Sequence, residues 1–228
     1  MNKSETIITS TEFNKSELQR LYGGRIAQKV AVIPLGFNTV RPTANFDPKK
    51  FGATKPYILS VGRLETKKNT KFLIQAFCVM KMSADIQLVL VGRPGVGYGP
   101  IERQIKQCPY IEDIIRLDYI SRADLAGLYK NAVALVFPSI YEGFGFPLLE
   151  ALSLGTPAIA GDIEALREVC GDACTYVDPF DVKLLSDTII ELVKNSGNQI
   201  KFSHEGRERA AQYSWDKAGA ETWNVIAS

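Results

Sequence analysis

Two glutamates that lie eight positions apart, Glu142 and Glu150, bracket a short stretch of glycine, phenylalanine and proline. The apolar run 132–137 before this stretch predicts a buried strand, and Pro147 fits the first position of a helix that contains Glu150. Ligands of open α/β sheets bind at such strand-to-helix corners. Either carboxylate can accept hydrogen bonds from a polyol, and the free N–H groups of the first helical turn favour an anion. A capping carboxylate and a loop carboxylate without a ligand are the alternative interpretation.

From residue 55 onwards, the chain alternates strand-like apolar runs with helical patterns, which predicts an α/β fold with a parallel sheet. The expected strands cover residues 56–61, 86–91, 114–117, 132–137, 157–160 and 174–177. The expected helices cover residues 70–82, 100–107 and 182–194, with one or two more in 200–226, where Ser214 caps the last. The preceding segment has a β-like run at 7–9, a possible helix at 15–22 and a strand at 30–34.

The composition excludes several classes of protein. A net charge of +2 over 228 residues, with 46% apolar residues, is ordinary for a globular chain and gives no reason to expect nucleic-acid binding. The single histidine, His204, excludes a His-rich zinc site. Without metal-ligand spacing, the four cysteines are expected to be free thiols in a reducing compartment: Cys78, Cys108, Cys170 and Cys174. With no secretory signal and no membrane-spanning apolar run, we expect a cytoplasmic protein, with peripheral attachment to the inner membrane face left open.

The stretch EGFGFP at residues 142–147, closed by Glu150, resembles the E-x7-E motif of the family-four retaining glycosyltransferases. Further segments resemble parts of the same family: 61–64 with 67–69, 89–92, 118–121, 125–129, 155–157 and 171–179. The similarity covers about residues 55–228. It implies a Rossmann-like parallel sheet with helices on both faces, the C-terminal, nucleotide-sugar-binding half of a GT-B fold.

The resemblance implies roles for individual residues. Arg63 and Lys68 match the family's diphosphate pair, and two cations of this kind could replace a bound metal. The chain also lacks the Asp-x-Asp motif of metal-dependent glycosyltransferases, so no metal and no other cofactor is expected. Glu142 would hold hydroxyl groups of the donor sugar, and Glu150 would bind the ribose. The nucleotide sugar would also meet residues at neighbouring strand and helix ends, namely Gly92, Tyr119, Ile120, Phe144, Gly145, Phe146 and Leu148.

Structural roles remain alternatives for several of these residues. Arg63 could belong to a solvated basic helix start, Gly92 to a simple turn, and Tyr119 and Ile120 to the packing of a strand end. The interpretation depends on one expectation about geometry: the four charged side chains should share a single hollow, namely Arg63, Lys68, Glu142 and Glu150.

Residues 1–45 resemble the last elements of the family's N-terminal domain. We therefore expect 1–45 to be a remnant of the acceptor domain with its linker, and 46–228 to be the Rossmann-like nucleotide-sugar-binding domain. In the family, the other domain usually carries the acceptor site and a histidine near the transferred sugar. We accordingly expect a partner chain that supplies this domain, or a second copy that pairs with the strand at 7–9.

These inferences favour a glycosyltransferase that moves a hexosyl group from a nucleotide sugar, such as GDP-mannose or a UDP-hexose, to a glycan or lipid-linked acceptor. Activity would need the missing N-terminal half. The alternative is a non-catalytic nucleotide-sugar-binding subunit of a two-chain glycosyltransferase. A glycosidase that uses Glu142 and Glu150 as acid and base would leave Arg63 and Lys68 without a task, and an epimerase would lack histidine partners.

Overall fold

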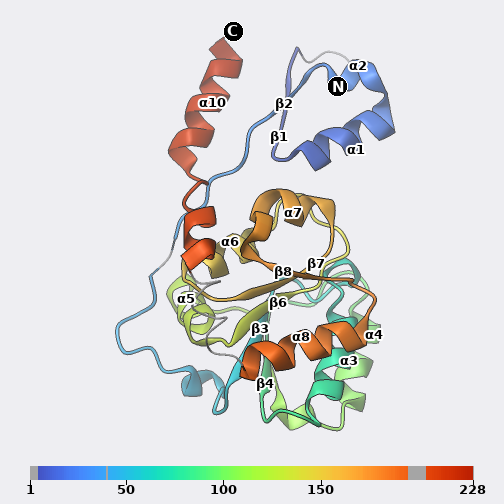
Figure 1. Cartoon of the computed structure of the whole chain (residues 1–228), viewed down its shortest axis with the longest axis vertical. Coiled ribbons are helices and arrows are strands. Elements are labelled where there is room, and N and C mark those ends of the chain that lie inside the picture. Colours follow the sequence, from blue (N-terminus) through green and yellow to red (C-terminus); the bar gives the residue numbers. More distant parts are fainter. Residues whose placement is uncertain (1–4, 40, 195–203, 228) are drawn as a thin grey trace.

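The computed structural model describes residues 5–39, 41–194 and 204–227 (Figure 1). Six parallel strands form its central sheet, in the order β5-β4-β3-β6-β7-β8. They are β3 (Tyr57–Val61), β4 (Gln87–Val91), β5 (Ile114–Leu117), β6 (Ala134–Phe137), β7 (Ala158–Gly161) and β8 (Thr175–Val177). The order reverses between β3 and β6, and such a reversal opens a crevice at the carboxyl ends of the strands. The predicted parallel α/β sheet is confirmed.

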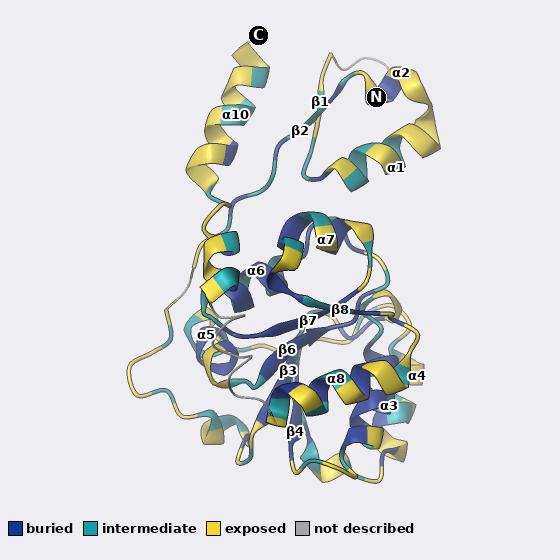
Figure 2. Ribbon diagram, viewed as in Figure 1, coloured by how far each residue is buried: buried dark blue, intermediate teal, exposed yellow. Residues whose placement is uncertain are grey.

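Helices cover both faces of the sheet, because alternate strand residues point to opposite sides. Leu59, Val89 and Leu135 belong to the core beneath α5 (Arg122–Asn131), α6 (Phe146–Ser153) and α7 (Glu164–Cys170). Ile58, Leu88 and Val136 belong to the core beneath α3 (Thr70–Met80), α4 (Tyr98–Gln107) and α8 (Val182–Lys194). Four short 3-10 helices join the elements: η1 (Pro48–Phe51), η2 (Thr66–Lys68), η3 (Ile111–Asp113) and η4 (Gly171–Ala173). Figure 2 shows the strands buried between these two layers, as the resemblance implied.

Two helices begin earlier than the sequence predicted. α1 (Glu12–Tyr22) starts three residues before the expected 15, because the Thr11 side chain caps it by accepting the Asn14 N–H. α4 starts at Tyr98, so that Pro100 lies within its first turn instead of before it. The expected break before the last helix is confirmed, since Ser214 Oγ accepts the N–H of Lys217. Residues 204–210 are helical, whereas 200–203 lie outside the described residues.

The N-terminal segment forms a small unit outside the six-stranded sheet. β1 (Ile7–Thr9) and β2 (Val30–Val32) pair in parallel, with α1 and α2 (Gly24–Ala27) between them in sequence. Figure 1 shows this unit and α10 (Trp215–Ala227) extending from the same side of the six-stranded domain. The boundary at residue 45 stays a prediction. Among the helices that the structure describes, none has the length and apolar character needed to cross a bilayer.

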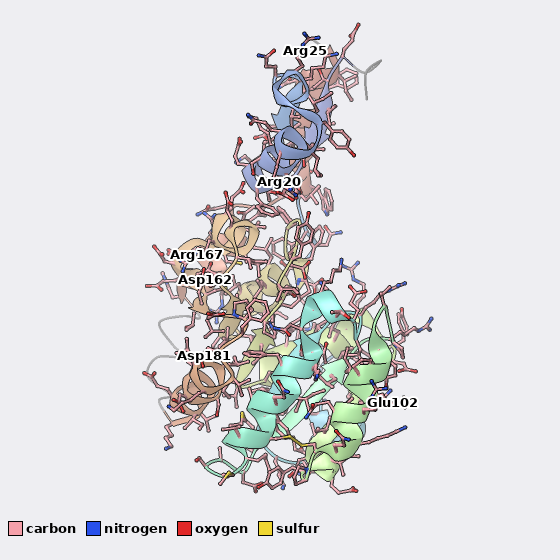
Figure 3. All side chains as sticks on the ribbon, turned by 90° about the vertical axis from the view of Figure 1, so that its right-hand side faces the viewer. Arg20, Arg25, Glu102, Asp162, Arg167 and Asp181 are labelled. Carbon is pink, nitrogen blue, oxygen red and sulfur yellow. A yellow bond between two sulfur atoms is a disulfide. The ribbon has the colours of Figure 1, made fainter. Side chains whose placement is uncertain are left out.

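One cysteine prediction is wrong. Cys78 of α3 and Cys108, which follows α4, form a disulfide across 6.4 Å between their Cα atoms (Figure 3). The pairing follows from α3 and α4 lying side by side in the fold, which a sequence separation of 30 did not indicate. Cys170 and Cys174 are buried free thiols, as expected.

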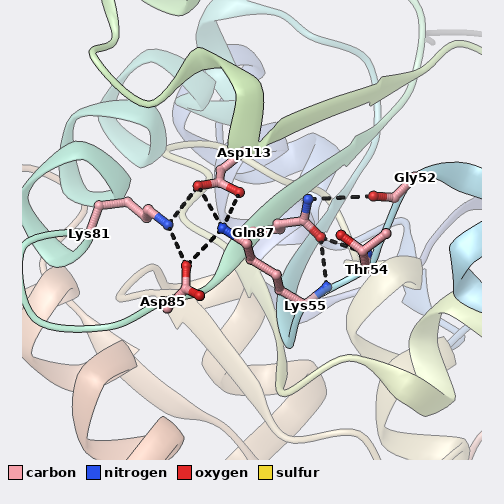
Figure 4. Close-up of polar contacts among 7 residues, drawn as sticks. All are labelled: Gly52, Thr54, Lys55, Lys81, Asp85, Gln87 and Asp113. Carbon is pink, nitrogen blue, oxygen red and sulfur yellow. Dashed lines mark hydrogen bonds and ion pairs between the residues drawn. The ribbon is translucent and has the colours of Figure 1, made fainter.

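A network of charges ties together the starts of three strands, at the amino-terminal edge of the sheet (Figure 4). Lys55 precedes β3, Asp85 precedes β4 and Asp113 precedes β5. Lys55 Nζ lies 2.9 Å from Asp85 Oδ1 and 3.0 Å from Asp113 Oδ1, and Lys81 Nζ lies 3.1 Å and 2.7 Å from the same two carboxylates. Gln87 Oε1 accepts the backbone N–H of Lys55 over 3.0 Å. The network lies at the edge of the sheet opposite the crevice, where it links the starts of neighbouring strands.

Candidate functional site

Lys68 and Glu142 meet where the strand order reverses. Lys68 ends η2 after β3, and Glu142 lies in the loop after β6. Their side chains are only 18% and 10% exposed, and Lys68 Nζ lies 2.5 Å from Glu142 Oε1. The ammonium also lies 4.7 Å from the centre of the Phe137 ring, a distance typical of a cation–π contact. Because both charges are largely removed from water, each needs the other to compensate its burial. A ligand that carries its own charged and polar groups could replace either partner.

Backbone contacts hold the loop that carries Lys68. The N–H of Ile140 donates to the carbonyl of Lys67 over 3.0 Å, which ties the loop after β6 to the loop after β3. Gly92 has a φ of +152°, and a Cβ there would lie 1.9 Å from the carbonyl oxygen of Gly62. Only glycine fits this close approach. Packing against Gly62 is therefore sufficient to explain a glycine at position 92, and the predicted role of Gly92 in admitting the nucleotide stays a prediction.

Helix α6 begins beside Glu142. Gly145 is its N-cap with a φ of +103°, and Pro147 lies in the first turn. The N–H of Leu148 donates to the carbonyl of Gly145 over 3.0 Å, so this amide is used within the turn. In the described part of the chain, no hydrogen bond engages the N–H of Gly145 or Phe146. These two amides at the positive end of the helix are available to an anion, while the ring of Phe144 is buried in the core.

Glu150 lies in a different environment. The hydroxyl of Tyr129 donates to Glu150 Oε2 over 2.9 Å. Burial raises the pKa of the Glu150 carboxyl, although the Tyr129 hydrogen bond and the charge of Arg122 act in the opposite direction. Glu150, Tyr129 and Arg122 line a small cavity with Asn38, and Lys68 and Glu142 do not belong to its wall.

The remaining predicted residues follow the carboxyl ends of the strands. Arg63 is exposed just after β3, and no ion pair among the residues seen in the structure engages it. Tyr119 is 77% exposed after β5, whereas Ile120 is half-buried against the core. Of the four side chains expected to share one hollow, the structure brings Lys68 and Glu142 into contact, whereas Glu150 lines a separate cavity. Arg63 follows the same strand, β3, as Lys68 does, and its place in the hollow stays a prediction. The individual roles of all these residues stay predictions.

Sequence reasoning missed two sets of contacts. Tyr129 entered the sequence analysis only within the segment 125–129 that resembles the family, and nothing in its spacing pointed to Glu150. Thr11 and Asn14 both donate to the carbonyl oxygen of Gly143, over 3.2 Å and 3.0 Å. Their polar pattern at a helix start could have located the N-terminus of α1, but not its partner 129 residues away.

Curated relatives match most of the chain. It is 32% identical over 238 residues to O-antigen chain mannosyltransferase B of Escherichia coli, a match that covers 99% of the chain and 61% of that protein. It is 30% identical over 201 residues to an MMP alpha-(1->4)-mannosyltransferase of Mycolicibacterium hassiacum, covering 86% of the chain and 47% of that protein. The chain thus spans about half to three fifths of the length of these relatives.

Solved structures share the fold. Anabaena HepE in complex with UDP-glucose matches with a TM-score of 0.87 at 16% identity, over 98% of this chain and 64% of its own. Sucrose-phosphate synthase from Thermosynechococcus elongatus matches with a TM-score of 0.81 at 24% identity, over 99% of this chain and 58% of its own. The sequence model of the family Glycosyl transferases group 1 matches residues 43–211, which include both Lys68 and Glu142. The chain, with Glu142 of its E-x7-E stretch placed at the reversal of a six-stranded parallel sheet, belongs to the group 1 glycosyl transferases.

Proposed function

We propose that this chain forms the donor-binding part of a retaining hexosyltransferase, which transfers a sugar from a nucleotide sugar to a glycan or lipid-linked acceptor. The observation that carries the proposal is the contact between Lys68 and Glu142 beside the start of α6. It sets a cation, a carboxylate and free amides around one point of the crevice, where a diphosphate and a sugar would lie next to each other. GDP-mannose is the first donor to test, because two of the matched relatives are named mannosyltransferases.

The proposed chemistry breaks the bond between the anomeric carbon and the diphosphate. Negative charge then grows on the leaving phosphate, and fixed positive groups stabilise it most where water is excluded. A cation about 4 Å from a phosphate oxygen interacts by roughly 4 kcal/mol at an effective dielectric near 20. Lys68, Arg63 and the amides of Gly145 and Phe146 would supply this stabilisation without a metal. Glu142 would accept hydrogen bonds from the donor sugar, and Glu150 would accept those of the ribose.

The acceptor half of the site would come from elsewhere in the assembly. A two-stranded sheet is marginal by itself, and Ile8 in β1 is 41% exposed. We propose that β1–β2 is completed by further strands, from a partner chain or from a second copy. Light scattering that gives a monomer, with fast amide exchange at residues 5–10, would argue against this. A cytoplasmic location with peripheral membrane attachment belongs to the same proposal, and cell fractionation tests it.

Calorimetry with GDP, UDP, GDP-mannose and UDP-glucose tests donor binding. We expect one nucleotide series to bind, and Lys68→Ala to weaken that binding without unfolding the domain. Mass spectrometry of incubations with the bound donor then detects a released nucleotide or a hexosylated acceptor, and added EDTA should leave the rate unchanged. No binding by any of the four compounds would contradict the proposal. The non-catalytic subunit is not favoured, because the matched relatives are named as transferases.

A further inference from the structure

The two neighbours of Glu142 both contact the N-terminal segment. The ring of Tyr141, on one side, meets the ring of Phe13 edge-on, with 5.9 Å between their centroids. The carbonyl oxygen of Gly143, on the other side, accepts the hydrogen bonds described above from the start of α1. Glu142 itself reaches away from this segment to Lys68. Its backbone is therefore held from both sides by residues that belong to another unit of the fold.

The start of α1 is built to present donors at this point. Thr11 is 1% exposed, and its hydroxyl accepts the N–H of Asn14 over 3.1 Å while it donates to Gly143. The side-chain amide of Asn14 donates to Gly143 and also to Ser10 Oγ, over 3.0 Å in each case. A Cβ at Gly143 would lie 3.4 Å from Nδ2 of this amide, so the Asn14 side chain packs directly against the Gly143 backbone. The contact is a packed polar cluster and not a pair of chance surface bonds.

A second anchor holds the helix in place. Glu168 of α7 accepts the backbone N–H groups of Glu12 and Phe13, over 2.7 Å and 3.0 Å. A carboxylate at the N-terminus of a helix is stabilised by the free amides and by the positive end of the helix dipole. Figure 1 shows α1 facing α7, in agreement with these bonds. The first turn of α1 is thus fixed between α7 and the loop that carries Glu142.

We propose that Thr11 and Asn14 are positioning residues for Glu142, which hold its loop in the conformation that presents the carboxylate to Lys68 and to the donor sugar. This inference rests on the proposed function. It adds that the N-terminal segment, beyond any role in acceptor binding, shapes the donor site through the carbonyl of Gly143. The effect of losing the contact should therefore fall on the sugar of the donor and spare the nucleotide.

The test compares Asn14→Ala with Ser16→Ala, a matched control on the same helix. Ser16 is exposed and donates only to the carbonyl of Phe13, over 2.8 Å. Amide exchange in peptides that cover residues 141–146 should accelerate about fivefold in Asn14→Ala, the factor that corresponds to one net hydrogen bond. Affinity for GDP-mannose should fall by about the same factor, while affinity for GDP should not fall, because a loosened Glu142 competes less for Lys68. Thr11→Ser, which keeps the hydroxyl, should behave as the wild type does.

The outcomes separate this inference from the proposed function. Equal amide exchange in Asn14→Ala, Ser16→Ala and the wild type overturns the positioning role, whether or not a nucleotide binds. Equal loss of GDP and GDP-mannose affinity in Asn14→Ala overturns it as well, because a general structural effect would not spare the nucleotide. If the wild type binds no nucleotide, the proposed function fails, and the exchange data still decide whether the loop is held.

Discussion

Neutralising the two partners of the Lys68–Glu142 pair one at a time distinguishes a ligand site from a structural ion pair. Lys68→Met keeps the apolar stem over Phe137 but removes the charge that would attract a diphosphate. Glu142→Gln keeps the shape of the side chain but removes a negative charge that the diphosphate would meet. We expect the two variants to change GDP affinity in opposite directions.

The magnitude follows from the charges. Two unit charges about 6 Å apart interact by on the order of 3 kcal/mol at an effective dielectric near 20. Water and salt in an open crevice reduce this to roughly 1–2 kcal/mol, and 1.4 kcal/mol corresponds to a factor of 10 in affinity. GDP should therefore bind about 5–20-fold more tightly to Glu142→Gln and about 5–20-fold more weakly to Lys68→Met. Donor turnover should fall in both variants, since Glu142 would hold the transferred sugar.

Calorimetry at low and high salt measures these affinities, and urea unfolding shows whether each variant is folded. Lys67→Met is the control, because Lys67 is 53% exposed and its ion pair with Glu65 spans 3.6 Å. A purely structural pair predicts a different pattern. Removing either partner would strand a largely buried charge, destabilise the fold by up to about 3–5 kcal/mol and weaken GDP binding in both cases. A change of the same sign in the two variants would refute the reasoning.

Three further predictions concern single residues. Glu150→Gln should gain stability relative to the wild type as pH rises above the ordinary glutamate range, because burial raises the pKa of Glu150 and its ionisation then opposes folding; a stability difference in urea that does not depend on pH would contradict this. Asp113→Asn should cost about 1–2 kcal/mol, because Lys81 loses a partner. Burial raises the pKa of Asp113, but the hydrogen bonds and charges of Lys81 and Lys55 outweigh burial, so the pKa is lowered overall. The stability difference between Asp113→Asn and the wild type should therefore vanish in acid, as pH falls through the lowered pKa. Gly92→Ala should cost at least about 2 kcal/mol, because its Cβ would meet a carbonyl oxygen, whereas Gly99→Ala, inside α4, should melt no lower than the wild type.

The sheet could be predicted because its strands are buried on both faces and are therefore nearly continuous apolar runs. Residues 87–91, for example, are all buried, and the predicted strand differs from β4 by one residue. The meeting of Lys68 and Glu142 across 74 positions followed from topology, since the segments that carry them follow two strands that lie side by side at the reversal of the sheet. The positions of the motifs and the order of the strands were together sufficient to predict that Lys68 and Glu142 lie close together.

The direction of Glu150 could not be predicted, because it depends on the rotation of α6 about its axis. Leu149 and Leu152 are fully buried in the core, and with 3.6 residues per turn their positions fix where position 150 points. The side chain reaches Tyr129 of α5 as a result. The Cys78–Cys108 disulfide and the Asn14–Gly143 contact were missed for a related reason. Each joins elements that are distant in sequence, and their side-by-side placement exists only in the assembled fold.

In the proposed donor site, the charge balance of the crevice gives the exposed Arg63 a task. The charges of Lys68 and Glu142 cancel while the two side chains are paired, so this pair attracts no anion from a distance. We therefore expect a diphosphate to be drawn in by Arg63 and by the amides at the start of α6 before it competes for Lys68. Once it has displaced Glu142 from the ammonium, the freed carboxylate needs hydrogen-bond donors, and the hydroxyl groups of a sugar next to the diphosphate would supply them. A donor that carries both groups satisfies both partners of the ion pair, whereas a nucleotide alone leaves Glu142 buried without one.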